Sequence, residues 1–540
     1  MHYNYKMEVK VLFKKEQFES DRYKCIYSGM PVKIGIKAGG DSLKWLLEKI
    51  ENDNISIEKA SRYITGYYVI LIIDKQDNRK YVFVDNSSVY KIYYSNKYCS
   101  DSFIELAKKE NKKFEDASMV KILEFLRFGF NFYPETLFDD IWQLHGNNIL
   151  EIDDSGNSKL LNKSNDIESI SIEEYFKGLA QSLKGLKISA DITGGIDSRL
   201  IVLLSKQYGI DFELAVNGNE VSEDVRIAEK ISNKLKQKLM VFDYDVLDNA
   251  EEFLIKSMQY CEGYTNALRI LNGFGISEAR KRKNMDMILT GVGGEFFKEI
   301  LLMHEFPFYT LGKLNVYKTF KMRFEPIPFQ YDLLTGEIAK FKDAVEQSIL
   351  DKMKDYVVSS KAKSLNSIWY YMKIPAFHGK FATSILQNFH DALSPYLDFQ
   401  IFLYAQKMSL KYRILDLFHR ELITRLNPKI AEVETSQLVS VSNKTFYILK
   451  DIFFTIINRI KRIVRKFTQK YLKKTILLES SLADDFFYKI KKLPVTEQYV
   501  DYLKRRGIVR KEVKTSSIRN NILGNIISLA YLFIKLDDEA

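Results

Sequence analysis

Cysteine is scarce in this chain of 540 residues, which contains only three, Cys25, Cys99 and Cys261, far apart from one another. Their number and spacing exclude a disulfide framework and a zinc site built from cysteines. Hydrophobic residues (46%) and charged residues (28%) occur at the levels of an ordinary globular protein. The cysteine usage fits a reducing compartment, so we expect a cytoplasmic protein, and the length predicts several domains.

Long apolar runs are also missing. The N-terminal sequence MHYNYKMEVKVLFKK has basic residues but lacks the apolar core of a secretory signal. The longest uncharged apolar stretch covers residues 520–534, which is shorter than the ~20 residues that span a bilayer. We therefore expect a buried helix there.

Positive charge is in excess, but only slightly. Lysine and arginine number 81 against 70 aspartate and glutamate residues, a net charge of +11. This excess is modest for the length and does not by itself indicate a nucleic-acid partner. The six histidines show none of the spacings of a metal site. We expect no nucleic-acid partner and no metal bound by histidines.

The first third of the chain is rich in predicted strands. Residues 66–74 and 81–85 are apolar runs separated by a polar turn, which predicts a hairpin. Their nearly continuous hydrophobicity predicts strands covered on both faces. Helices are expected near 102–110 and 117–128, and a short strand at 148–152. The polar run at 153–166 is a candidate boundary.

From about residue 171 helices alternate with strands. Such βαβ units predict a parallel sheet, in which ligands bind at the carboxyl ends of the strands. Beyond about residue 360 the pattern is mostly helical. The expected strands are 186–192, 212–216, 239–242 and 285–289, and the expected helices are 171–183, 198–208 and 222–236.

One segment combines the features of a phosphate-binding loop. It reads TGGIDS and lies between a predicted strand and a predicted helix. Gly194 and Gly195 let backbone N–H groups approach an anion, Thr193 and Ser198 add hydroxyl groups, and the helix N-terminus favours negative charge. Asp197 fits if a divalent cation joins its carboxylate to phosphate oxygens. The segment predicts a pyrophosphate site with a metal; the alternative is a plain strand–turn–helix junction.

A second glycine loop follows the predicted strand 285–289 and contains Gly291, Gly293, Gly294 and Glu295. Alone, it is better interpreted as a structural turn. Two such loops on neighbouring parallel strands can face each other across one nucleotide, however, with Asp197 and Glu295 sharing the metal.

These motifs resemble those of a known family. TGGIDS is similar to the SGGxDS loop of the ATP-pyrophosphatase (PP-loop) enzymes, and GVGGEF to the GxGxDE loop of their asparagine synthetase branch. Residues 394–398 (SPYLD) and 405–413 are similar to two further segments of that branch. Residues 82–94 and 126–146 are similar to parts of its class II glutamine amidotransferase domain. The resemblance covers roughly residues 1–435, with the motifs in the same order.

The resemblance implies a fold of the α/β class with three parts. Residues 1–160 would form an N-terminal αββα amidotransferase-like (Ntn-type) domain. Residues 170–436 would form a parallel-sheet α/β PP-loop synthetase domain that binds ATP, and residues 437–540 a basic, helical C-terminal extension.

Several positions depart from the family. The glutaminase half needs a cysteine after the initiator methionine, but His2 stands there. We therefore expect no glutamine hydrolysis, as in the β-lactam synthetase branch, with nitrogen coming from ammonia or a substrate amine. Phe296 replaces an acidic residue of the second loop. Ser436 stands where the family has its catalytic lysine; Lys429, Lys444 or a residue from elsewhere would have to substitute.

The function that the resemblance implies is an ATP-dependent, amide-forming ligase. A substrate carboxylate would attack the α-phosphate of ATP, and an amine would then attack the acyl-adenylate. Mg²⁺ would be held by Asp197 and Glu295, with Asp391 as a base or orienting group, Lys429 as a candidate lysine, and the adenine near Val216. The carboxylate could belong to a small molecule, a glycan or a peptide.

Three alternatives remain open. The altered positions suit a non-catalytic, nucleotide-binding protein of the same fold. The net charge allows a PP-loop enzyme acting on tRNA, although no cysteine pair for sulfur transfer and no basic–aromatic module is present. The third is a membrane-surface protein.

That third alternative depends on residues 448–474, which have apolar residues at helical spacing and a basic opposite side on which Asp451 is the only acid. A basic amphipathic helix can make a peripheral contact with an anionic membrane, here the inner membrane surface. The favoured interpretation is a helix packed on the synthetase domain with a solvated basic face.

Overall fold

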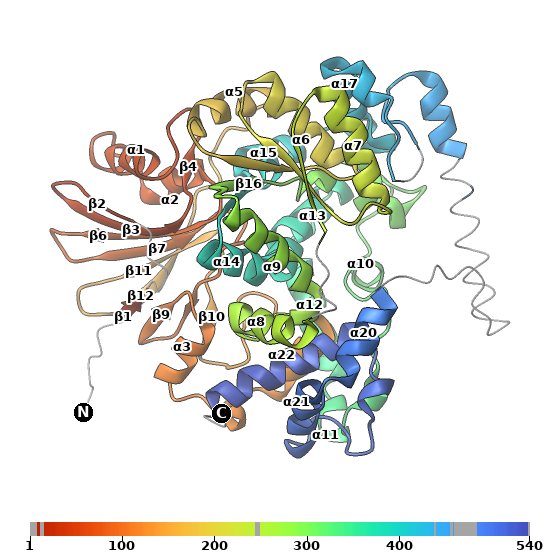
Figure 1. The fold of residues 1–540 in the computed structure, drawn as a ribbon. Helices are drawn as coiled ribbons and strands as arrows, with labels where there is room; N and C mark the ends of the chain where they lie inside the picture. The colour runs from red at the N-terminus through yellow and green to blue at the C-terminus, as the bar shows by residue number, and fades with distance from the viewer. Residues whose placement is uncertain are drawn as a thin grey trace.

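The computed structural model describes residues 8–10, 16–243, 249–436, 439–453, 457 and 483–537. It is a mixed α/β protein with 52% helix and 14% strand. Three larger sheets organise it, two formed by the first third of the chain and one by the middle (Figure 1).

The largest sheet is antiparallel, with strand order β12-β11-β7-β6-β3-β2. The hairpin predicted for residues 66–85 is confirmed as β6 paired with β7. Side chains of β6 alternate between two cores: Tyr68 and Ile70 pack with helix α1 (Gly40–Glu51), whereas Val69 and Leu71 join the main core. Both faces are covered, as the unbroken apolar run predicted. The strands are β2 (Glu16–Glu19), β3 (Tyr23–Gly29), β6 (Tyr68–Asp74), β7 (Lys80–Val84), β11 (Asn148–Ile152) and β12 (Ser158–Asn162).

A smaller, mixed sheet has the order β1-β9-β8-β10, and helices α3 and α4 pack into the same main core. Both helices were predicted. The short strands were not, because two or three residues are too few to show a periodicity. The elements are β1 (Glu8–Lys10), β8 (Tyr93–Tyr94), β9 (Tyr98–Ser100), β10 (Trp142–Gln143), α3 (Phe103–Lys109) and α4 (Met119–Phe128). Beside α1 lie α2 (Ile57–Ala60) and the strand pair β4 (Val32–Lys33) and β5 (Ile64–Thr65).

The middle of the chain forms a five-stranded sheet in the order β15-β14-β13-β16-β17, and all its pairs are parallel. The prediction of a parallel sheet is confirmed. Helices α5, α6 and α7 lie on one side of it, and α9 and α14 on the other (Figure 1). The elements are α5 (Ile172–Ser182), β13 (Ile188–Asp191), α6 (Ile196–Gln207), β14 (Glu213–Asn217), α7 (Glu223–Leu235), β15 (Leu239–Phe242), α9 (Ala267–Arg282), β16 (Met287–Leu289), α14 (Ile374–Asn388) and β17 (Asp391–Leu393).

Strand β17 is an edge strand that the sequence pattern did not predict. Further helices follow β15, and the elements that the structure describes after β17 are all helices. They are α8 (Ala250–Cys261), α10 (Val316–Arg323), α11 (Gly336–Ala339), α12 (Lys342–Lys354), α13 (Lys361–Ile368), a π-helical turn at Trp369–Lys373, α15 (Phe399–Lys407), α16 (Leu410–Arg413), α17 (Leu417–Leu426) and α18 (Pro428–Ala431).

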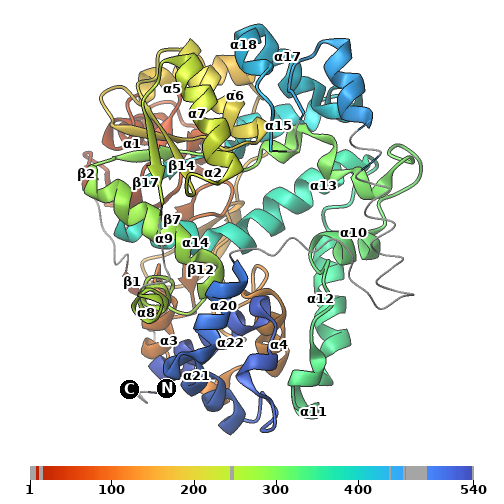
Figure 2. The same cartoon turned by 45° about the vertical axis from the view of Figure 1, so that its right-hand side comes forward.

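The apolar stretch 520–534 lies within a buried helix, as predicted: α22 (Asn520–Leu536). It packs against α4, α9 and α21 (Pro494–Arg505), and α20 (Ala483–Lys492) comes directly before α21 (Figure 2). Asn525 joins distant parts of the chain, because its Nδ2 donates to Leu126 O at 2.8 Å and its Oδ1 accepts from Asn266 Nδ2 at 2.6 Å. Helix α22 thus completes the core between α4, from the first third of the chain, and α9, from the middle.

The basic helix expected at 448–474 lies largely outside the described residues. Residues 445–453 are helical, and beyond them only residue 457 is described before 483. Within the described ranges, we find no helix with the length and apolar character needed to cross a membrane.

We expect Leu529→Ala in α22 to lower the free energy of unfolding by about 2–5 kcal/mol, because it leaves a cavity at a fully buried position. The matched control is Leu160→Ala on β12, an exposed leucine, with an expected change within about 0.5 kcal/mol. Urea unfolding followed by circular dichroism measures both. Equal shifts would contradict the core role of α22.

Candidate functional site

Strand β13 lies between β14 and β16, so the sheet reverses its strand order at the carboxyl end of β13. After β13 the chain runs through α6 to β14, which pairs with one edge of β13. Strand β16 pairs with its other edge. Open α/β sheets bind ligands at such a switch point. Both predicted glycine loops lie there: residues 192–195 follow β13, and residues 290–293 follow β16.

The first loop is held by its own polar groups. The Thr193 N–H donates to Ser198 Oγ at 3.1 Å, and the Gly195 N–H donates to Thr193 Oγ1 at 3.2 Å. The Gly194 N–H donates to the carboxylate of Asp224, on α7, at 2.8 Å. One amide of the loop therefore already holds an anionic oxygen, and a phosphate would compete with Asp224 for it.

The two loops touch through their glycines. A Cβ added to Gly291 would stand 2.9 Å from the backbone nitrogen of Ser198, and one added to Gly294 would stand 2.4 Å from Cγ of Asp197. Such distances leave no room for a side chain. Gly293 has φ +91°, a conformation that side chains disfavour. The two loops are therefore neighbours, as expected, but they lie in direct contact with each other at these glycines.

Asp197 lies at the centre of a charged cluster. Lys298 Nζ donates to its Oδ2 at 2.5 Å, and His419 Nε2 lies 3.1 Å from its Oδ1. Burial disfavours the charged carboxylate, but the neighbouring His419 and Lys298 outweigh burial and lower the pKa of Asp197. Burial also disfavours the ammonium of Lys298, yet the carboxylates of Asp197 and Asp416 raise its pKa. The pair is therefore ionised at neutral pH.

The other two acids of the cluster are harder to ionise. Burial raises the pKa of Glu295, whose Oε1 accepts a hydrogen bond from Trp369 Nε1 at 3.0 Å. Burial also raises the pKa of Asp416. Leu415 and Asp416 have φ of +54° and +57°, which costs about 1 kcal/mol or more for each non-glycine residue. The strained turn brings Asp416 next to Lys298 and His419.

The donor set fits a magnesium ion only together with phosphate. Among the described residues no group of three or more His, Cys, Asp or Glu side chains is arranged to hold a metal. Asp197 and Glu295 are two carboxylates, and one of them is bound to Lys298. Mg²⁺ that arrives with a nucleotide needs one or two carboxylates, since phosphate oxygens and water complete its coordination. The cluster suits that role and not a cage built by protein alone.

The SPYLD motif supports the loops. Ser394 Oγ donates to Val292 O at 2.5 Å, and Tyr396 Oη donates to Asp197 O at 3.3 Å. Asp398 caps α15 by accepting from the N–H groups of Gln400 and Ile401 at 2.7 and 3.1 Å. The motif therefore holds both loops in place and starts the next helix.

Other candidate residues lie at different distances from the loops. Val216 is buried near the carboxyl end of β14, beside the first loop. The Ser436 N–H donates to Gly194 O at 3.4 Å, so Ser436 lies on that loop.

Asp391 begins β17 opposite Met287, at the far end of the sheet from the loops. Lys429 is exposed on α18. The structure thus does not bring Asp391 and Lys429 to the cluster, and Lys444 pairs with Glu432 at 2.6 Å.

Sequence reasoning missed Lys298, His419, Asp224 and Asp416. Lys298 follows Glu295 by three residues, so its closeness could have been noticed. The other three come from distant helices, and their role is visible only from the packing. The role of the buried Arg199 is also visible only from the packing. Its guanidinium donates to Val433 O at 2.6 Å and holds the segment before Ser436 against α6.

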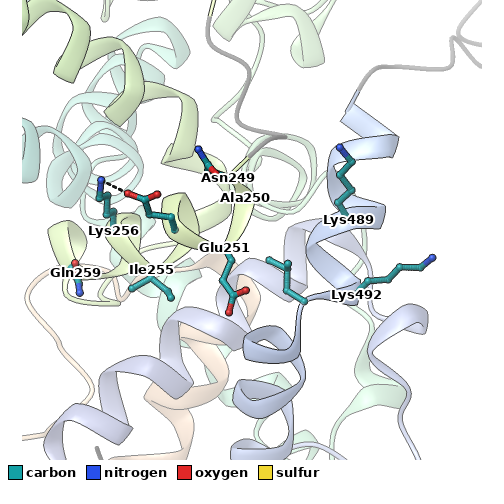
Figure 3. A pocket seen from close by; sticks show the side chains of 10 residues that line it. Asn249, Ala250, Glu251, Ile255, Lys256, Gln259, Lys489 and Lys492 are labelled. Atoms are coloured by element: carbon teal, nitrogen blue, oxygen red, sulfur yellow. Dashed lines mark ion pairs between the residues drawn. The ribbon is translucent and has the colours of Figure 1, made fainter.

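A hollow of about 880 Å³ lies elsewhere, between α8 and α20 (Figure 3). Lys489 and Lys492 of α20 stand opposite Glu251 of α8, and Lys256 is paired with Glu252 at 2.6 Å. None of the residues singled out by the motifs lines it. The glycine loops therefore remain the candidate site.

The fold and the facing loops define an α/β protein with its candidate site at the switch point of a parallel sheet. Comparisons with known proteins add no family to this description: no protein-family model matches the chain, and no curated protein matches it.

We expect Gly294→Ala to reduce the binding of ATP at least ~10-fold, because its Cβ would displace Asp197. The matched control is Gly336→Ala on α11, where a Cβ meets no atom within 4 Å. Calorimetric titration with ATP and Mg²⁺ measures binding, and thermal unfolding checks the fold. Unchanged affinity in a folded Gly294→Ala protein would show that ATP binding does not depend on the contact between the loops.

We expect Asp398→Asn to remove part of the pH dependence of stability. Burial raises the pKa of Asp398 from 3.8 to about 6, so between these pH values the folded state binds a proton that the unfolded state has lost. The stabilisation is complete below pH ~4 and is lost as the pH rises to about 6, a loss of about 3 kcal/mol. Asparagine keeps the helix cap without titrating.

Urea midpoints at pH 4 and pH 7 test this: the variant should lose less stability on going to pH 7 than the parent protein does. An equal loss in both proteins would show that another group carries the pH dependence.

Proposed function

We propose that this protein is an ATP-dependent, AMP-forming carboxylate–amine ligase of the asparagine synthetase-like, PP-loop kind. The observation that carries the proposal is the meeting of two glycine loops around Asp197 at a switch point of a parallel sheet. Backbone N–H groups, two hydroxyl groups and a helix N-terminus there suit a pyrophosphate.

The residues of the two loops would have different roles in binding ATP. Thr193, Gly194, Gly195 and Ser198 would bind the pyrophosphate, with Gly291, Gly293 and Gly294 closing the other side and Val216 next to the adenine. Asp197 and Glu295 would hold a Mg²⁺ ion, whose charge would neutralise that of the phosphates.

Lys298 would supply the fixed cation. Its ammonium is buried, is charged at neutral pH and lies 2.5 Å from Asp197 Oδ2. A preorganised cation in a site with little water stabilises the charge that develops on the α-phosphate as pyrophosphate leaves. His419 and Asp416 would orient this pair through their contacts with it.

The substrate would be a carboxylate of a small molecule, a glycan or a peptide, and the nitrogen would come from ammonia or a substrate amine. All three cysteines of the chain are buried, and burial raises the pKa of Cys25 and Cys261 to about 12. Cys25 also lies in the middle of β3, paired with β2. A thiolate nucleophile for glutamine hydrolysis is therefore not available among them.

A second candidate is a nucleotide-binding protein without turnover. Phe296 supports it, because this side chain lies in an aromatic cluster with Phe402 at 5.7 Å and Tyr370 at 6.0 Å rather than presenting an acid to the site. Asp224 on the amide of Gly194 also favours weak phosphate binding.

The test is pyrophosphate release from ATP and Mg²⁺, with ammonia and a panel of carboxylates. We expect carboxylate-dependent release that falls ~10²–10³-fold in Lys298→Ala, because the variant loses the fixed cation. Lys340→Ala, which changes an exposed lysine directly after α11, is the matched control. Ser436 lies on the first loop. Adding Ser436→Lys to the Lys298→Ala variant should therefore raise the rate of pyrophosphate release at least ~10-fold above that of Lys298→Ala alone.

Binding of ATP without release for any carboxylate would establish the second candidate instead. Absence of both binding and release would leave the glycine loops as structural turns. Full activity in Lys298→Ala would remove the lysine from the mechanism and leave the ligase proposal standing.

A further inference from the structure

Exposed apolar side chains concentrate in one part of the chain. Of the fifteen large hydrophobic side chains that are exposed among the described residues, seven lie within residues 300–327. We call these seven the apolar set: Ile300, Phe306, Phe308, Leu311, Tyr317, Met322 and Ile327. Single exposed hydrophobic residues are normal, but a concentration of this kind marks an interaction surface.

The centre of the apolar set is a loop that points into solvent. Phe306, Phe308 and Leu311 are 55%, 57% and 64% exposed. The segment joins the 3₁₀ turn at Met303–Glu305 to α10 and runs along the outer edge of the molecule (Figure 2). An aromatic side chain that is more than half exposed on a loop is a projection and not the wall of a groove.

The charge around the apolar set is positive on the outside. Lys313 and Lys318 are exposed, and Lys318 Nζ lies 3.7 Å from Oε1 of the buried Glu305. The acids Glu305 and Glu325 are turned inward, where Glu305 pairs with Lys361 and Glu325 with Arg127, both at 2.6 Å. The outer surface therefore combines projecting apolar side chains with ammonium groups.

A second small cluster has the same composition. Phe446, Leu449 and Phe453 are 71%, 60% and 62% exposed on the helical residues 445–453. Their spacing of three and four residues puts them on one face of that helix. In both views this helix and the loop before α10 lie at the right-hand edge of the molecule (Figures 1 and 2).

We propose that this edge docks on an anionic lipid bilayer, with the apolar set inserted at the headgroup level and Lys313 and Lys318 against the lipid phosphates. Projecting aromatic and aliphatic side chains gain free energy when they enter the acyl boundary. Lysines near the surface add attraction to anionic lipids. A bilayer accepts a projecting loop without a complementary shape, whereas a protein partner would need one.

Docking would also orient the candidate site. Ile300 lies two residues after Lys298, so the second glycine loop continues directly into the docking surface. A carboxylate carried at the level of the lipid headgroups would then approach the site from the membrane side.

The experiment is flotation of the full-length protein with vesicles of phosphatidylcholine, with and without phosphatidylglycerol. We expect binding to the anionic vesicles, a decrease with added salt, and a loss of at least ~10-fold in the triple variant Phe306→Ser, Phe308→Ser and Leu311→Ser. Lys313→Glu with Lys318→Glu should weaken binding to anionic vesicles only.

The matched control is the triple variant Leu160→Ser, Val221→Ser and Val358→Ser, which changes three exposed residues elsewhere and should bind like the parent protein. All eight substituted positions lie in exposed places, so each variant should keep the parent unfolding temperature, which thermal unfolding checks.

Three outcomes would overturn the proposal. The first is no flotation of the parent protein. The second is flotation that survives the apolar triple variant and disappears when Lys461, Arg462, Arg465 and Lys466 are changed to Glu, which would put the contact in residues 448–474. The third is self-association in sedimentation that the apolar triple variant abolishes without any vesicle binding, which would make the surface an interface between copies.

Discussion

The close approach of two backbone loops at Asp197 is the constraint on which the candidate site depends. Gly291 and Gly294 bring the second loop within contact of Asp197 and Ser198, at distances where any side chain would collide. That contact in turn places Lys298 on the carboxylate of Asp197. Ser394 and Tyr396 donate hydrogen bonds to the two loops from a third segment. Glycine at these positions is therefore required by steric exclusion, and the charge cluster follows from it.

The electrostatics of the charged cluster explain why Asp197 lies beside Lys298 and His419. Each of its acids is largely buried, and burial acts to raise the pKa of each. Asp197 stays ionised because Lys298 and His419 surround it, whereas Glu295 and Asp416 have raised pKa values. The site thus presents one strong ion pair and two carboxyl groups that become anionic more readily when a further cation approaches. Such an arrangement suits a phosphate ligand that brings a metal ion with it.

The rest of the fold holds these loops in a fixed place. The main core is continuous from the N-terminal sheets through the parallel sheet to α22. Asn525 connects α22 to α4 and α9 through two hydrogen bonds. A helix from the end of the chain thus fixes parts that the sequence divides into separate domains. By contrast, the side chains of the apolar set are exposed, and so are Lys313 and Lys318.

The sequence by itself determined the elements whose periodicity is long enough to recognise: the β6–β7 hairpin, the alternation of β13–β16 with helices, the buried α22, and the two glycine loops. Local patterns suffice there because hydrophobic spacing and glycine placement are local properties. Only the tertiary structure decided that Asp391 lies at the far end of its strand, that Lys429 is exposed and that Lys298, His419 and Asp416 surround Asp197. Which distant side chains meet depends on packing, and one sequence carries no record of contacts between residues more than a hundred positions apart.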